Sequence, residues 1–231
     1  MTSKELSKRI LTSLFLISAM ILAINYNYIL IILLIIVSLI SWIEFNALTF
    51  KIFKKQDLYT RSTLAVLKVL SLLYLLVFSL FVFDGVLNGM KSIEPNSKLN
   101  IIYLFSICIF SDIGGLIFGK IFKGKKLTKI SPNKTISGSV GSFILSICLV
   151  PFFNYLFEKS HDLLILIILS ITVSLACQFG DLFISYLKRK AKVKDTGDLL
   201  PGHGGVLDRI DGMLFAIPIG SLLWQFLVII I

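Results

Sequence analysis

The sequence predicts an all-α integral membrane protein, built as a polytopic bundle of about seven transmembrane helices. Two observations support this fold class. Apolar residues make up 56% of the 231 residues and charged residues only 16%, whereas roughly a quarter of a soluble domain is charged. The apolar residues are also gathered in long runs, close to the roughly 20 residues that a helix needs to cross a bilayer. A soluble protein with an apolar-rich core does not explain runs of this length.

The expected transmembrane segments follow one another along the whole chain. In order, they are residues 10–25, 28–43, 64–83, 100–119, 138–157, 163–184 and 212–230. The first two runs are short and are separated by only a few polar residues, which predicts a helical hairpin. Basic residues precede the first run as in a signal peptide, but no small-residue cleavage site follows it, so we expect a retained helix.

Lys and Arg residues are distributed unequally between the segments that connect these runs. If the N-terminus is cytoplasmic, 20 of the 23 basic residues fall on the cytoplasmic side, in residues 1–9, 44–68, 120–134 and 185–211. Only Lys91, Lys98 and Lys159 fall on the other side. This bias predicts that the N-terminus and the basic loops lie on the cytoplasmic side of the cell's inner (plasma) membrane. The same distribution explains the net charge of +10 as a topology signal and as an attraction to anionic lipids of the bilayer. Nucleic acid is therefore not needed as a partner.

Two groups of residues have plain explanations in this arrangement. The cysteines Cys108, Cys148 and Cys177 lie in apolar runs without the spacing of metal ligands, so we interpret them as small core residues. Glu44 lies at the end of the second run, where the predicted topology alone accounts for a charged residue.

A stripe of polar residues follows the sixth apolar run. Gln178, Asp181, Ser185 and Lys188 are separated by three, four and three positions, which places them on one face of a helix. A carboxylate in or near a bilayer is costly, so Asp181 should face the protein interior or a polar cavity. It belongs either to a functional site or to a structural Asp–Lys pair near the helix end.

A second group of carboxylates, Asp208 and Asp211, lies at the start of the last predicted helix. Their oxygens could hold a hard cation such as Mg²⁺, although acidic residues in a first helical turn are also favoured by the helix dipole. The glycine-rich stretch 201–205 precedes them, and its backbone N–H groups could approach an anion. Within it, His203 could contact phosphate or could be an ordinary turn residue.

The other basic loop, residues 120–137, also contains groups that suit phosphate. Ser131, Lys134 and Thr135 supply hydroxyl donors and a cation of the kind that bind phosphate oxygens. The loop lacks the spaced glycines of a Walker A motif. Upstream, Asp112 is a lone charge in an apolar run and is therefore a candidate site residue. The alternative is a lysine-rich cytoplasmic anchor with an incidental Asp.

The polar stretch 185–211 closely resembles the signature of the phosphatidate cytidylyltransferases, also called CDP-diacylglycerol synthases. The matching residues are Ser185, Lys188, Arg189, Lys194, Asp195, Gly197, Pro201, His203, Gly204, Gly205, Asp208, Arg209 and Asp211. Gln178, Gly180 and Asp181 resemble the beginning of this signature. A second region is similar to the family at Asp112, Gly119, Lys120, Ser131, Pro132, Lys134, Thr135 and Gly138, and it departs from the family pattern at Ser137 and Ser142. Residues 1–100 resemble the family only in hydropathy.

The resemblance implies transfer of the cytidylyl group of CTP to phosphatidate, giving CDP-diacylglycerol and pyrophosphate in phospholipid biosynthesis. It implies a Mg²⁺-dependent nucleotidyltransferase, and a homodimer is a further family expectation. We accordingly expect N-terminal transmembrane helices in residues 1–99 and a catalytic transmembrane region in residues 100–231. The cytoplasmic active-site loops of that region are 120–137 and 185–211.

The resemblance also implies roles for individual residues. Asp181, Asp208 and Asp211 would hold Mg²⁺ on the phosphates. Phosphate oxygens would be bound by Lys188, Arg189, Arg209 and the loop with His203, Gly204 and Gly205. Ser131, Lys134 and Thr135 would close over the nucleotide, with Asp112 positioning that loop or a cation. Ser185 and Lys194 complete the expected binding residues.

Three other functions stay open on the sequence alone. A CTP-dependent lipid kinase of the same superfamily would transfer the γ-phosphate and release CDP. A CDP-alcohol phosphatidyltransferase would share Asp211 and Gly212, but the paired aspartates expected later in that helix are absent. A membrane transporter would explain seven spans and buried aspartates, but not the concentration of polar residues in the cytoplasmic loops.

Overall fold

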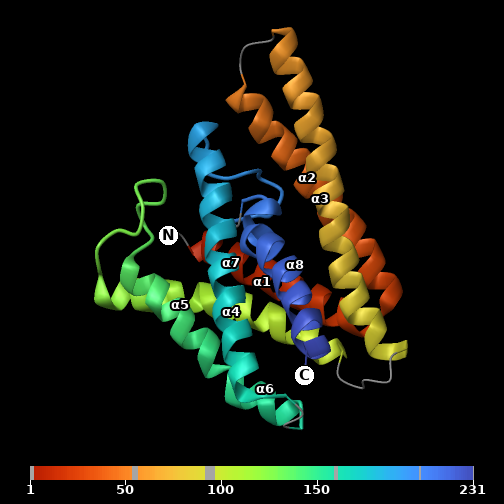
Figure 1. Ribbon diagram of the computed structural model, residues 1–231. Coiled ribbons are helices and arrows are strands. Elements are labelled where there is room, and N and C mark those ends of the chain that lie inside the picture. The colour runs from red at the N-terminus through yellow and green to blue at the C-terminus, as the bar shows by residue number, and fades with distance from the viewer. Residues whose placement is uncertain (1–2, 54–56, 92–96, 159–160, 203, 231) are drawn as a thin grey trace. The chain divides into compact units, whose positions relative to one another are not determined.

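The computed structural model describes residues 3–53, 57–91, 97–158, 161–202 and 204–230, and within these ranges every regular element is a helix. The helices are α1 (Ser3–Asn25), α2 (Asn27–Ile52), α3 (Leu58–Lys91), α4 (Ser97–Phe122), α5 (Ile136–Cys148), α6 (Val150–Leu156), α7 (Leu163–Lys190) and α8 (Leu207–Ile230) (Figure 1). The predicted all-α fold class is therefore confirmed.

Among the residues that the structure describes, six segments are long and apolar enough to cross a membrane, so the chain is a multi-pass membrane protein. They are Asn27–Ile52, Tyr59–Val86, Lys98–Phe122, Ile136–Leu156, Leu163–Lys190 and Leu207–Leu227. The sequence predicts about seven, and the difference lies in α1. Its apolar part, Leu14–Asn25, is shorter than a span, because the helix begins with the basic residues that precede the first apolar run. Only Tyr26 separates α1 from α2, and backbone hydrogen bonds from Tyr26 to Leu22 and from Leu30 to Tyr26 continue through this break. The predicted hairpin of the first two helices therefore stays a prediction.

The helices extend further than the apolar runs, so the predicted loops are too long. α7 continues to Lys190 and α8 begins at Leu207, which reduces the loop 185–211 to residues 191–206. Likewise, α4 and α5 reduce the loop 120–137 to residues 123–135. Lysine and arginine have good helix propensity, so a change from apolar to basic residues does not end a helix. The predicted span 138–157 is divided at Leu149, because Pro151 lies in the first turn of α6 and has no N–H to continue α5.

Two compact units contain these helices. The first unit comprises residues 1–83 and 187–210, and the second comprises residues 84–186 and 211–231. These two units do not test the expected functional division into residues 1–99 and 100–231, which stays a prediction. The signature stretch contributes residues to both units, because α7 passes into the first unit at its end and α8 passes into the second after its first turn.

In the first unit, α2 and α3 run alongside each other and are joined by polar contacts (Figure 1). The hydroxyls of Ser38 and Ser79 lie 2.8 Å apart, and Trp42 donates from Nε1 to the carbonyl oxygen of Lys68 at 3.0 Å. α1 is connected to the 191–206 loop, since the Thr12 hydroxyl donates to the carbonyl oxygen of Pro201 at 3.0 Å. This loop is therefore anchored within the first unit.

In the second unit, α4 and α5 approach each other closely enough that glycine is required between them. A Cβ at Gly114 would lie 2.8 Å from the carbonyl carbon of Gly141, and a Cβ at Gly138 would lie 2.7 Å from the carbonyl oxygen of Gly115. α4 also bonds to α7 through the hydroxyls of Ser111 and Ser174, which lie 2.9 Å apart. These close contacts fix the ends of both helices that border the 123–135 loop.

Candidate active site

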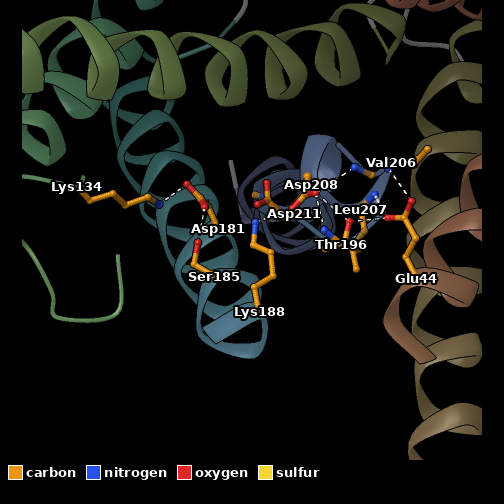
Figure 2. Close-up of polar contacts among 12 residues, drawn as sticks. Glu44, Lys134, Asp181, Ser185, Lys188, Thr196, Val206, Leu207, Asp208 and Asp211 are labelled. Atoms are coloured by element: carbon orange, nitrogen blue, oxygen red, sulfur yellow. Dashed lines mark hydrogen bonds and ion pairs between the residues drawn. The ribbon is translucent and has the colours of Figure 1, made fainter. Parts of the chain in front are cut away.

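The central feature of the first unit is a buried ion pair between the ends of two helices. Lys188, in the last turn of α7, donates from Nζ to Oδ1 of Asp208, in the first turn of α8, at 2.6 Å (Figure 2). The Asp208 side chain is 4% exposed and that of Lys188 is 13% exposed. A charge-assisted bond in such a place is strong, and leaving either partner alone would be costly.

The second oxygen of Asp208 holds the signature loop against the start of α8. Oδ2 accepts from the backbone N–H of Thr196 at 2.8 Å and from that of Gly205 at 3.1 Å. A carboxylate in a first helical turn that reaches back to an earlier N–H group satisfies backbone donors that lack a helical partner. Asp208 therefore organises both ends of the stretch 196–205.

Between these ends the chain makes a tight turn that depends on glycine. The backbones of Leu200 and Gly204 exchange two hydrogen bonds of 2.9 and 3.1 Å. Gly202 and Gly204 adopt positive φ angles of 77° and 81°, which L side chains rarely accept. The N–H groups of Gly204 and Gly205 are engaged inside the protein, by Leu200 and by Asp208. The predicted role of His203 lies outside the described residues.

Glu44 is a site residue that the sequence interpretation missed. It projects from α2, is 7% exposed, and accepts from the Thr196 hydroxyl at 2.6 Å and from the N–H groups of Val206 and Leu207 at 3.0 and 2.9 Å (Figure 2). Topology alone does not account for these three bonds. The available signal was a carboxylate in a largely apolar helix. This signal indicates a candidate site residue at Glu44 as much as at Asp112.

The second unit contains a separate polar cluster around Asp181. Lys134, from the 123–135 loop, forms an ion pair with Oδ2 of Asp181, and the Ser185 hydroxyl donates to Oδ1 at 3.3 Å (Figure 2). One helical turn earlier, Gln178 accepts from the Ser139 hydroxyl of α5 at 2.5 Å. The predicted polar stripe of α7 is thus confirmed, and it contacts the other predicted loop. The alternative interpretation was a structural Asp–Lys pair near the helix end. Asp181 does form an ion pair with a lysine, but this lysine is Lys134 of the loop, whereas Lys188 pairs with Asp208.

The 123–135 loop is closed by its own backbone and by hydroxyl groups. Leu127 donates to Lys134 at 2.8 Å, and the Thr135 hydroxyl accepts from the Gly138 N–H at 3.0 Å as the N-cap of α5. Ser131 is half-buried, and its carbonyl oxygen accepts from the Lys134 N–H at 3.1 Å.

The two departures from the family pattern have structural partners. The hydroxyl of Ser137 accepts from the N–H of Gly124 at 3.3 Å, which ties the two ends of the loop together. The hydroxyl of Ser142 donates to the carbonyl oxygen of Ser111 at 2.6 Å, between α5 and α4. Both serines therefore stabilise the region in which they depart from the pattern.

The two remaining carboxylates lie in the second unit near Cys177. Asp112 Oδ1 is 3.9 Å from the Cys177 sulfur, and Asp211 Oδ1 accepts from the N–H of Gly212 at 2.8 Å. A Cβ at Gly180 would lie 2.5 Å from the carbonyl oxygen of Asp211, so α7 and α8 pass each other closely beside Asp181.

In the part of the chain that the structure describes, no group of three or more His, Cys, Asp or Glu residues could hold a metal ion. Asp208 belongs to the first unit, and Asp181 and Asp211 belong to the second. The assignment of these three residues to Mg²⁺ therefore stays a prediction. Arg189, Lys194 and Arg209 are exposed cations on α7, the 191–206 loop and α8.

Comparisons with known proteins show which family the sequence is similar to. The profile of the cytidylyltransferase family matches residues 1–227. A phosphatidate cytidylyltransferase of Rickettsia bellii is 35% identical over 225 residues, covering 91% of this chain and 87% of that protein. Proteins with the same name from Helicobacter pylori and Rickettsia typhi are 44% and 41% identical over 115 and 138 residues, or 50% and 55% of this chain. These two matches span about half of the relatives' length, 43% and 59% respectively.

Proposed function

The chain belongs to the cytidylyltransferase family, and on this basis we propose that it transfers the cytidylyl group of CTP to phosphatidate, giving CDP-diacylglycerol and pyrophosphate. The observation that carries the proposal is the buried Lys188–Asp208 pair, because it orders the signature loop at the ends of two apolar helices. A reaction between a lipid and a nucleotide requires polar groups at such a membrane boundary. The names of the relatives support the choice of phosphatidate as the lipid.

The reaction needs charge neutralisation more than it needs a base. A phosphate oxygen of phosphatidate attacks the α-phosphorus of CTP, a new P–O bond forms, and the bond to the leaving pyrophosphate breaks. The second pKa of a phosphomonoester is about 6, so the nucleophile is already ionised near neutral pH. Two anions must still be brought into line, which requires positioned cations. We assign this task to the exposed Arg189, Lys194 and Arg209 and to the paired Lys188 and Lys134.

We further propose that Mg²⁺ assists the reaction, held by Asp181, Asp208 and Asp211. Carboxylate oxygens are suitable donors, and Mg²⁺ is usually bound by one or two carboxylates together with substrate phosphates and water. Asp208 Oδ1 and each oxygen of Asp181 have one described partner, and a carboxylate oxygen has two lone pairs, so these residues fit the ion. When bound, Mg²⁺ would neutralise charge on the transferring and leaving phosphates.

Purified protein in detergent provides the decisive experiment. CTP, phosphatidate and Mg²⁺ should give equal amounts of pyrophosphate and CDP-lipid, whereas ATP, GTP or the omission of lipid should give neither. Chelation of Mg²⁺ should abolish product, and its restoration should recover it. Release of CDP with a phosphorylated lipid would indicate the lipid kinase instead. Nucleotide turnover that does not depend on phosphatidate would overturn the proposal.

A further inference from the structure

We propose that Glu44 is a positioning residue for cytidylyl transfer: from α2, it fixes the geometry of the signature loop and of the start of α8. The expected effect on the reaction rests on the proposed function. The role of Glu44 in fixing the loop and the start of α8 does not depend on it. Glu44 lies 152 residues before Thr196 in the chain and touches none of the expected phosphate-binding cations in the described contacts. Its effect on the reaction must therefore pass through the loop.

Glu44 completes the beginning of α8. The first N–H groups of a helix have no helical partner, and a side chain from just before the helix usually satisfies them. Here the N–H groups of Val206 and Leu207 are satisfied by Oε1 and Oε2 of Glu44, at 3.0 and 2.9 Å. The negative charge also lies at the positive end of the helix dipole. The position of the first turn of α8, which contains Asp208, is therefore set by α2.

The burial of Glu44 makes these bonds obligatory. Its side chain is almost inaccessible at 7% exposure, and neither ion pair of the described residues includes it. A buried carboxylate without a cation is stable only if hydrogen-bond donors replace water. The three donors from the loop and from α8 meet this requirement. Displacement of the loop would remove all three together, so Glu44 favours one loop position strongly.

Two glycines of the signature are explained by the same carboxylate. A Cβ at Gly197 would lie 2.7 Å from Oε1 of Glu44, and a Cβ at Gly205 would lie 2.7 Å from its Cδ. Neither glycine has a positive φ, so backbone conformation is not the reason for glycine at these positions. The loop closes around Glu44 and leaves no space for side chains there. At Gly205 the Thr196 hydroxyl lies even closer to the Cβ position, so glycine in this part of the signature reflects contact with Glu44 and with the hydroxyl that Glu44 holds.

Thr196 connects Glu44 to the Lys188–Asp208 pair. Its hydroxyl is 2.6 Å from Oε2 of Glu44 and 3.0 Å from Oδ2 of Asp208, and a hydroxyl has one proton, which the shorter contact takes. Its backbone N–H donates to Asp208 at 2.8 Å. Thr196 is therefore fixed on one side by Glu44 and on the other by Asp208. Loss of the Glu44 charge should loosen the residue next to Asp195 and Lys194 and disturb Asp208.

The variant Glu44→Gln tests this inference. Gln preserves the volume, but its amide group presents N–H donors to a site where three protein donors already converge. We expect kcat/KM for CTP to fall about tenfold to a hundredfold per folded molecule, as for a small misplacement of reacting groups. We also expect faster hydrogen exchange of the amides in residues 196–207. Thr196→Val should act in the same direction, and the double variant should lose less than the product of the two single losses.

Leu48→Ala is the matched control, because Leu48 lies one turn further along α2, is 1% exposed and has no hydrogen-bonding group to offer the loop. It should lower the melting temperature while kcat/KM per folded molecule and exchange in 196–207 stay at the wild-type level. Equal kinetic loss in Leu48→Ala and Glu44→Gln would reduce Glu44 to a stability role and overturn the inference. Unchanged exchange in Glu44→Gln would also overturn it. Hydrogen exchange requires no turnover, so an inactive wild-type protein would refute the proposed function while exchange still decided the role of Glu44.

Discussion

Lys188 and Asp208 stabilise each other in a place where neither would be stable alone. Their charged atoms are 2.6 Å apart, and both side chains are largely buried at the junction of α7, α8 and the 191–206 loop. Removing one partner of a buried pair leaves the other without compensation, which costs more than the pair itself contributes. Asp208 also accepts two backbone N–H groups, so its loss would release the loop as well. The first function of this pair is to give the signature loop its shape.

We predict that Lys188→Met destabilises the protein and abolishes cytidylyl transfer. The Asp208 carboxylate would remain buried without its cation, at a cost of about 3–5 kcal/mol. Thermal unfolding in detergent, followed by tryptophan fluorescence, measures the change in stability, and CDP-lipid formation measures activity. Lys192→Met is the control, since it removes the same charge from an exposed position just beyond α7. A melting temperature equal to that of Lys192→Met would contradict the structural role of the pair.

Site residues could be predicted from the sequence where their neighbours are close in the chain, and were missed where their partners are distant. The helical stripe with Asp181 and Ser185 follows from spacing within one helix, and the structure confirms it. The cation beside each carboxylate does not follow from spacing, because Lys134 comes from another loop and Lys188 pairs across the 191–206 loop. Glu44 was missed for the same reason. Its donors follow it by more than 150 residues, so no local pattern connects them.

At the scale of elements, the loops are defined by how their ends are held. The 123–135 loop joins α4 to α5, which are packed at glycines, and its only described link to α7 is the Lys134–Asp181 ion pair. Helix ends could be predicted only approximately, because basic residues continue α7 beyond the apolar run and Pro151 interrupts the fifth span. Sequence therefore predicts the type and order of the elements better than their number and limits.

We predict that Asp181→Asn increases the mobility of the 123–135 loop. Asparagine keeps the shape of the side chain but loses the charge that holds Lys134. Limited trypsin digestion should then cleave after the exposed Lys125, Lys126 and Lys129 several times faster than in the wild-type protein. Ser185→Ala is the control, because it removes only the 3.3 Å hydrogen bond to the same carboxylate. Identical digestion of the wild type and Asp181→Asn would show that the ion pair does not hold the loop.

We predict that Gly114→Ala separates α4 from α5. The added Cβ would lie 2.8 Å from a backbone carbon of Gly141, and backbone atoms cannot move aside as a side chain can. Overpacking of this kind costs about 1–3 kcal/mol, which should appear as a lower melting temperature. Leu116→Ala, on an exposed part of the same helix, should change it much less. Equal melting temperatures for Gly114→Ala and the wild type would mean that the helices cross less closely.

At the scale of the whole molecule, the outward surface of the helices is apolar where a bilayer would cover it. Ile35 and Ile43 of α2 and Val66 and Leu80 of α3 are each more than half exposed, which would be unfavourable in water over so large an area. Charged residues are concentrated in the connections and at the helix ends that border them, and the basic ones are mostly in alternate connections. The fold is therefore divided into an apolar surface for lipid and polar connections for water-soluble ligands. Which connections face the cytoplasm is a prediction from the distribution of charge alone.

We predict that the 123–135 loop is cytoplasmic and that the connection between α6 and α7 lies on the opposite side. Single cysteines at Ser131 and Asp162, introduced after replacement of Cys108, Cys148 and Cys177, report the side of each segment. A membrane-impermeant maleimide should label Ser131→Cys only in inverted membrane vesicles and Asp162→Cys only in spheroplasts. Permeabilised membranes should label both, which controls for accessibility. CTP is a cytoplasmic metabolite, so labelling of Ser131→Cys from outside would contradict both the topology and a site for CTP at this loop.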